Sequence, residues 1–88
     1  MKYELYSNIK IKSQDVPFSF DANGTAYTSI DCKKFYICAI ILNTDEWIIA
    51  IPFTYKNNDN YIIKAVNMVE MSTKANFTTS AKIFYSSI

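Results

Sequence analysis

Two apolar runs that flank a short polar segment constrain this 88-residue chain more than any other feature. The first run covers residues 35–42 and the second residues 47–55, and both are rich in β-branched and aromatic side chains. Between them lie Asn43, Thr44, Asp45 and Glu46, which are polar residues that favour turns. The pattern is typical of a β-hairpin and predicts two antiparallel strands joined by a four-residue loop.

In that register, directly opposed residues share a face of the hairpin. The large apolar face pairs, in order, Leu42 with Trp47, Ile40 with Ile49, Cys38 with Ile51 and Tyr36 with Phe53. The other face is also apolar, but it is small at its centre around Ala50. A hairpin that is apolar on both faces needs cover on both sides, from the fold or from a partner. Because Pro52 cannot donate to the ladder, we expect an edge position or a bulge near the end of the second strand.

The residues before the hairpin contain strand and turn signals. Residues 2–12 alternate between apolar and polar positions, which predicts a half-buried strand whose lysines face water. Residues 13–17 end this strand, and residues 18–20 form a short one. Gly24 follows Asn23 in a segment that suits a hairpin turn. Residues 26–30 then return as a strand.

The residues after the hairpin begin with a polar turn over residues 56–60. A five-residue loop pairs Phe53 with Ile63 and extends the large apolar face onto the next strand. Residues 65–71 fit either the end of that strand or about two turns of helix, and we favour the strand. After a loop, the alternation over residues 77–86 predicts a final strand.

Together these elements predict one all-β domain over residues 1–88 with six to seven short strands. Most of the strands are expected to be consecutive antiparallel neighbours. We therefore expect a small antiparallel meander, either barrel-like or a strongly curved sheet. A helix over residues 65–71 would change the class to α+β.

Charge and residue usage exclude several functional classes. The formal net charge is +1, and all nine basic residues are lysines. A DNA mimic would be strongly acidic, and a strong non-specific nucleic-acid binder would be basic. The chain has no arginine for bidentate contacts to phosphate or guanine, and no histidine for general-base catalysis or metal binding.

Neither the acids nor the cysteines form a pattern that supports catalysis. Asp45 and Glu46 are adjacent in a turn, where solvated acids are common. Cys32 and Cys38 would lie roughly 20 Å apart on one strand, too far for a disulfide. Two thiols without histidine are also too few for a zinc site. We expect buried, reduced thiols, no catalytic residue, no cofactor and no metal, and hence a protein that is not an enzyme.

Residues 35–56 resemble, in their hydrophobic pattern, the strand pair of small SH3-like barrel toxins that cleave RNA. The resemblance covers about a quarter of the chain and matches no catalytic position of that family. Small barrels also bind single strands through aromatic rings and lysines, and this chain has seven tyrosines. A single-stranded nucleic-acid-binding barrel or a barrel-type ribonuclease toxin is therefore the alternative function. Eight acids offset the nine lysines, which makes it the less favoured one.

We favour a small non-enzymatic module that binds another protein. Half of the residues are hydrophobic and only 19% are charged, so we expect some apolar surface to be kept for a partner. The lysine- and asparagine-rich composition suggests an AT-rich genome, and a viral or mobile-element inhibitor of a host defence or enzyme system fits this class. The interface candidates are Tyr36, Trp47, Phe53, Tyr55, Tyr61, Met68 and Met71.

A second copy of the chain is another expected partner, since a homodimer could form by edge pairing of the N-terminal or C-terminal strand. We expect the polar, alternating N-terminus not to be a signal peptide, and the longest apolar run is too short to span a membrane. We therefore expect a cytoplasmic protein with no membrane partner.

Overall fold

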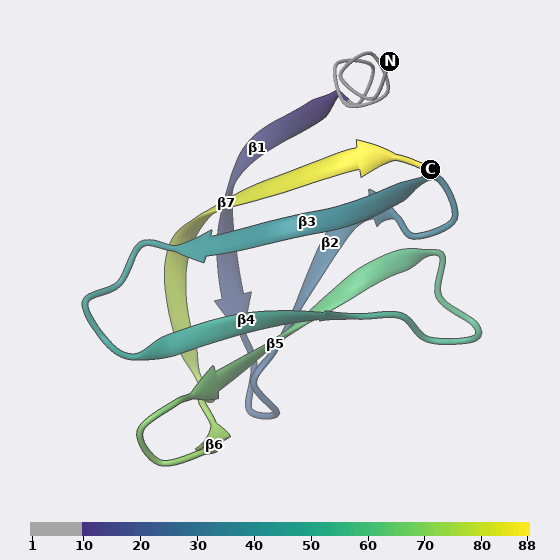
Figure 1. The fold of residues 1–88 in the computed structure, drawn as a ribbon. Helices are drawn as coiled ribbons and strands as arrows, with labels where there is room; N and C mark the ends of the chain where they lie inside the picture. Colours follow the sequence, from purple (N-terminus) through teal and green to yellow (C-terminus); the bar gives the residue numbers. More distant parts are fainter. Residues whose placement is uncertain (1–9) are drawn as a thin grey trace.

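The structure of the protein, a computed structural model, describes residues 10–88, and these residues form seven β-strands (Figure 1). The strands are β1 (Ile11–Phe20), β2 (Thr25–Asp31), β3 (Phe35–Leu42), β4 (Ile48–Phe53), β5 (Asn60–Asn67), β6 (Ser72–Thr73) and β7 (Phe77–Ser87). Within this part of the chain there is no helix long and apolar enough to cross a membrane. The predicted all-β class is confirmed.

The strands form two antiparallel sheets. One has the order β1-β7-β3 and the other the order β2-β5-β4, with the short β6 also paired to β5. Consecutive strands β4, β5 and β6 share a sheet, whereas the chain changes sheet between β1 and β2, β2 and β3, β3 and β4, and β6 and β7. Strands such as β7 curve strongly, but the two sheets do not close into a barrel (Figure 1).

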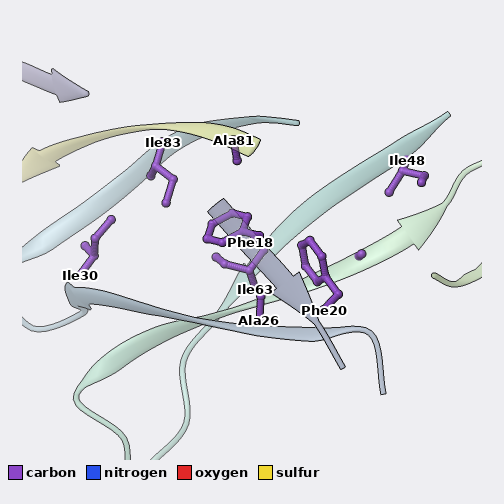
Figure 2. Close-up of a cluster of buried hydrophobic side chains, with 9 residues drawn as sticks. Phe18, Phe20, Ala26, Ile30, Ile48, Ile63, Ala81 and Ile83 are labelled. Atoms are coloured by element: carbon purple, nitrogen blue, oxygen red, sulfur yellow. The ribbon is translucent and has the colours of Figure 1, made fainter. Parts of the chain in front are cut away.

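Buried side chains from both sheets meet in an apolar core (Figure 2). The β1-β7-β3 sheet and the β2-β5-β4 sheet together contribute Phe18, Phe20, Ala81, Ile83, Ala26, Ile30, Ile48, Ile63 and Ala65. Ile63 is fully buried and Ile83 is 1% exposed. Phe20 stacks on Phe77 with their ring centroids 4.7 Å apart. The longer strands therefore turn alternate residues to the space between the sheets, with a break in the alternation of β3 between Ile37 and Ile40.

The predicted hairpin over residues 35–55 is wrong in its pairing, although both of its strands exist. β3 pairs with β7, and β4 pairs with β5. The connection crosses between the sheets, where the Asn43 N–H donates to the Ser80 carbonyl (2.9 Å) and the Met68 N–H donates to the Trp47 carbonyl (2.8 Å). Because the two strands lie in opposite sheets, each buries one apolar face in the shared core. A hairpin of the same strands would have needed cover on both sides.

The pairing of β4 with β5 was expected, but its register differs from the predicted one by one residue. Phe53 lies opposite Ile62 and not opposite Ile63. The connection from Phe53 to its paired residue is one residue shorter than predicted, and Asn60 already belongs to β5. A shift of one residue moves every side chain of a strand to the other face. Ile63 therefore faces the core, and Lys64 faces outward.

The first described strand extends further toward the C-terminus than predicted. β1 continues through residues 13–17, where a break was expected. Pro17 is tolerated there because β1 is an edge strand of the described sheet and pairs only with β7. Pro52 lies in β4, which is an edge strand of the second sheet, as predicted. Of the strand predicted over residues 2–12, residues 2–9 lie outside the described part of the chain.

The C-terminal strand β7 is the central strand of its sheet, with β1 on one side and β3 on the other. Both of its backbone edges are therefore hydrogen-bonded within the chain. The prediction that this strand offers a free edge for a second copy is wrong.

The Asn23-Gly24 turn forms as predicted, but it does not close a hairpin. Gly24 has a φ of 70°. The Asp21 Oδ1 atom accepts the N–H groups of Asn23 (2.8 Å) and Thr25 (3.0 Å). Beyond this turn the strands separate, since β1 pairs with β7 and β2 pairs with β5. The turn is a corner between the two sheets.

Residues 65–71 form the end of β5 and a turn. The strand continues to Asn67, whose Oδ1 atom accepts the N–H groups of Val69 (3.0 Å) and Glu70 (3.2 Å). Met71 closes the turn with a positive φ of 55°. The helical alternative is wrong, and the favoured strand is confirmed as far as Asn67.

Cys32 and Cys38 are both free thiols. Cys32 is half-buried, and its Sγ atom lies 3.7 Å from the Asn58 carbonyl oxygen. Cys38 is exposed at an irregular position of β3, where the pairing with β7 shifts register between Ile37 and Ala39. The expectation that both thiols are buried is therefore wrong for Cys38.

Candidate functional site

The candidate site is the surface of the β2-β5-β4 sheet that points away from the core. Along β4, Ile48 and Ala50 contribute to the core, so the intervening residues Ile49, Ile51 and Phe53 point outward. The same alternation turns Ile63 of β5 inward and its neighbours outward. The large apolar side chains of β4 thus lie on the outer side of the sheet.

Strand register arranges the outward residues in rows across the sheet. Three rows are set by the pairing of β5 with its neighbours: Phe53–Ile62–Tyr27, Ile51–Lys64–Thr25 and Ile49–Val66–Thr73. The hydrogen bond between the Met68 N–H and the Trp47 carbonyl extends the ladder by one step and adds Trp47 and Met68. Met71, at the other end of the turn that Met68 begins, completes a fourth row. These four rows are called the outer face below.

The outer face is apolar and much of it is exposed. Trp47 and Met71 are 76% and 73% exposed, and Tyr27 is 67% exposed. Ile49 and Phe53 are also exposed. Exposed aromatic and methionine side chains on neighbouring strands are the composition that protein interfaces favour.

The middle column of the outer face is less exposed than its margins. Ile62 lies between Tyr27 and Phe53 in its row and is only 4% exposed, although it does not belong to the core cluster. Val66 and Lys64 on the same strand are half-buried. The face therefore presents exposed side chains on β4, on β2 and in the β5–β6 turn, and the side chains of the central strand β5 between them are less exposed.

Charge on the outer face is confined to Lys64. Among the described residues, no carboxylate lies within ion-pair distance of its ammonium group, whereas Lys74 pairs with Glu46 at 3.6 Å. Glu46 lies next in sequence to Trp47 and Glu70 next to Met71, at the same end of the face, and Asp45 precedes Glu46. The face thus combines an apolar surface, one central cation and acidic residues at one end.

The structure brings together four of the seven interface residues predicted from the sequence. Trp47, Phe53, Met68 and Met71 lie on the outer face. Tyr36 is exposed on β3, in the other sheet, and Tyr55 is exposed in the loop after β4.

The Tyr61 side chain makes a contact within the fold and is not part of the outer face. Its hydroxyl donates to the Phe35 carbonyl at 2.7 Å and so connects β5 to β3 in the opposite sheet. Burial raises the pKa of the Tyr61 hydroxyl above its ordinary value. Its ring packs against the core cluster.

Sequence reasoning missed the residues of β2 and β5 on this face, including Tyr27, Ile62, Lys64 and Val66. The alternation of β4 had already placed Trp47, Ile49, Ile51 and Phe53 on one side. The missing information was the register between β4 and β5. The observed register differs by one residue from the predicted one and places Ile62 and Lys64 on the same side as these β4 residues.

The exposed strand tyrosines Tyr27 and Tyr36 do not share a surface in the described part of the chain. Tyr27 lies on β2 and Tyr36 on β3, in different sheets. Lys33 pairs with Asp59 at 3.1 Å, and this carboxylate raises the pKa of the Lys33 ammonium group. Lys82 lies on the outer side of the other sheet, 3.8 Å from Asp15. A single-strand channel needs both residue types along one path.

One hollow of the described residues lies over β3 and β7 and is lined by Asp15, Ile41, Leu42, Asn43, Ser80, Ala81 and Lys82. Another lies between β1 and β2. It is lined by Gln14, Val16, Pro17, Phe18, Tyr27, Thr28, Ser29, Asn60 and Ile83. Tyr27 is its only ionisable side chain, so the hollow contains no nucleophile–base or carboxylate pair. Over residues 10–88, no group of three histidine, cysteine, aspartate or glutamate side chains gathers at metal-binding distance.

Comparisons of the chain with protein-family models, with curated proteins and with solved structures give no match.

Proposed function

We propose that this chain is a small non-enzymatic module that binds another protein through the outer face. The observation that carries the proposal is the run of four cross-strand rows in which Lys64 is the only charge. Exposing such a surface to water is unfavourable, and large contiguous apolar patches on soluble domains are typical of interaction sites.

The size of the outer face agrees with this role. Each row occupies about 6.7 Å along the strands and each strand about 4.8 Å across the sheet, so four rows on three strands cover about 27 Å by 14 Å, or roughly 400 Å². The largest apolar patch of a typical monomer covers about 300–600 Å² and is often functional. A standard interface covers about 800 Å² on each partner, so the bound partner is expected to extend beyond the face.

Within the class of protein-binding modules, we propose an inhibitor of a host defence or enzyme system. Such a protein acts by covering a partner's surface and needs no catalytic group of its own. An apolar sheet surface with exposed Trp47, Tyr27 and Met71 suits this mode of action.

The test is capture of a partner from a host-cell lysate, with and without nuclease. The wild-type chain is compared with Ile49→Glu, which places a charge on the outer face. The matched control is Ile41→Glu, because Ile41 is an exposed isoleucine on β3 in the other sheet. We expect the wild type and Ile41→Glu to retain a stoichiometric, nuclease-resistant partner that Ile49→Glu loses.

Two results would contradict the proposal. If Ile49→Glu, folded by circular dichroism, retains the partner as well as Ile41→Glu does, the outer face is not the binding surface. If nuclease removes the captured material, the chain binds nucleic acid instead, and the alternative function takes its place.

A further inference from the structure

The position of Lys64 specifies the chemistry of the partner. Lys64 lies on the central strand β5, between Ile51 of β4 and Thr25 of β2, and Ile62 and Val66 flank it along its own strand. Its row is one of the two inner rows of the outer face, so Lys64 lies close to the centre of the face. Any partner that covers the face therefore covers this ammonium group.

Covering Lys64 with a purely apolar surface is unfavourable. Among the described residues, Lys33, Lys74 and Lys82 each have a carboxylate within 4 Å, whereas Lys64 and the other described lysines have none. A charge that loses its water without gaining a counter-ion strongly opposes association. The described neighbours of Lys64 on the face supply no carboxylate, so we expect a partner that covers Lys64 to supply the counter-ion.

We infer that the partner is a protein whose contact surface is apolar and carries one aspartate or glutamate carboxylate, which lies over Lys64. This inference rests on the proposed function and names the partner's chemistry. The aliphatic stem of Lys64 packs among Ile51, Ile62 and Val66, and its ammonium group donates to the carboxylate. The partner's apolar side chains cover the outer rows.

The same charge excludes a second copy of the chain as the occupant. A two-fold, face-to-face pair of outer faces has its axis through the middle of the face. Lys64 of one copy would then lie close to Lys64 of the other, and like charges in a covered interface oppose binding. Two outer faces are therefore not expected to bind each other, whereas a surface with a negative charge at its centre is expected to bind.

This reasoning can be tested without the natural partner, because Lys64→Glu turns the chain itself into the expected surface. The variant presents the same apolar rows around a central carboxylate. We expect the wild type alone and Lys64→Glu alone to sediment as monomers. An equimolar mixture of the two is expected to form a one-to-one dimer, at least about tenfold tighter than either self-association.

The concentration has to suit a small interface. A face-to-face pair buries roughly 800 Å² in total, which is below the standard range, so sedimentation velocity is run at about 0.5 mM of each chain. The charge-matched control is Lys82→Glu, which makes the same change on the outer side of the other sheet. A mixture of Lys82→Glu with the wild type is expected to remain monomeric.

A mixture of wild type and Lys64→Glu that stays monomeric, or a wild type that dimerises alone through the face, would overturn the inference. If Lys64→Glu fails to fold by near-ultraviolet circular dichroism, Lys64→Met replaces it. That variant removes the repelling charge and keeps an unbranched chain, so it is expected to self-associate at this concentration, and a monomer would overturn the inference. The capture experiment with Ile49→Glu is independent, so loss of the partner there combined with a failed mixture would refute only the role of Lys64.

Discussion

Replacing Gly24 by alanine is expected to destabilise the protein by about 2–4 kcal/mol. Gly24 is the corner between the two sheets, and its φ of 70° lies in the left-handed region. Placing an L-residue there costs about 1–2 kcal/mol. The added Cβ atom would also overlap Thr73 Cγ2 and lie 2.9 Å from the Lys74 carbonyl oxygen, so the segment after β5 would have to move.

That movement weakens the hydrogen bonds that connect the Gly24 turn and the segment after β6 to β5. The Gly24 carbonyl accepts the Ala65 N–H at 3.0 Å, and the Ala65 carbonyl accepts the Lys74 N–H at 3.0 Å. Weakening both costs about 1–3 kcal/mol in total. Alanine also restricts the unfolded chain, which offsets about 0.4–1 kcal/mol. For a domain of this size, the net loss lowers the Tm by roughly 10–25 °C.

The assay is urea and thermal unfolding followed by far-ultraviolet circular dichroism, because Trp47 is exposed and its fluorescence reports unfolding poorly. Asn23→Ala is the control at the neighbouring exposed position and should change the free energy of unfolding by less than about 0.5 kcal/mol. Combining Gly24→Ala with Thr73→Ala should recover the part of the loss that comes from the Thr73 methyl group. A stability of Gly24→Ala within about 0.5 kcal/mol of the wild type would refute the reasoning.

Two further predictions concern the core and the contact between the sheets. Ile63→Ala, at a fully buried position, should lower the free energy of unfolding by about 2–5 kcal/mol, whereas Ile41→Ala at an exposed strand position should lower it far less; equal losses in urea titrations would contradict the assigned facing of the strands. Tyr61→Phe removes the 2.7 Å hydrogen bond to the Phe35 carbonyl and should cost about 1 kcal/mol at pH 7. Because burial raises the Tyr61 pKa in the folded state, its contribution is full below the unfolded pKa of about 10 and is lost as pH rises through the folded value. The stability difference between Tyr61→Phe and the wild type should therefore shrink above about pH 10 in urea titrations, and an unchanged difference would exclude this linkage.

The sequence predicted the strands better than their partners. Residues 35–42, 47–55 and 77–86 were expected as strands and correspond closely to β3, β4 and β7. Alternation and β-branched composition are local properties, so a sequence reports them directly. The break expected over residues 13–17 did not form, because Pro17 occupies an edge strand, and edge positions are known only once the sheet is known.

The candidate site was predicted in part for the same reason. The alternation of β4 grouped Trp47 and Phe53 on one side, and the structure places both on the outer face. The sequence provided no means to see that this side turns away from the core, since both sides of β4 are apolar. Lys64 was expected opposite Pro52, on the small face, and the one-residue difference in register places it opposite Ile51, near the centre of the site.

The amino-acid sequence alone established an all-β chain with its main turns, a near-neutral charge, and an arginine- and histidine-free composition. Each of these properties depends on residues close together in the chain or on composition. The packed fold determined that β3 and β4 lie in opposite sheets, that β7 lies between β1 and β3, and that the larger face of β4 meets solvent. A strand that is apolar on both faces can pair with several other strands without a difference that is visible in the local sequence. Their partners are selected by long-range burial in a common core, and that selection decides which apolar surface remains outside.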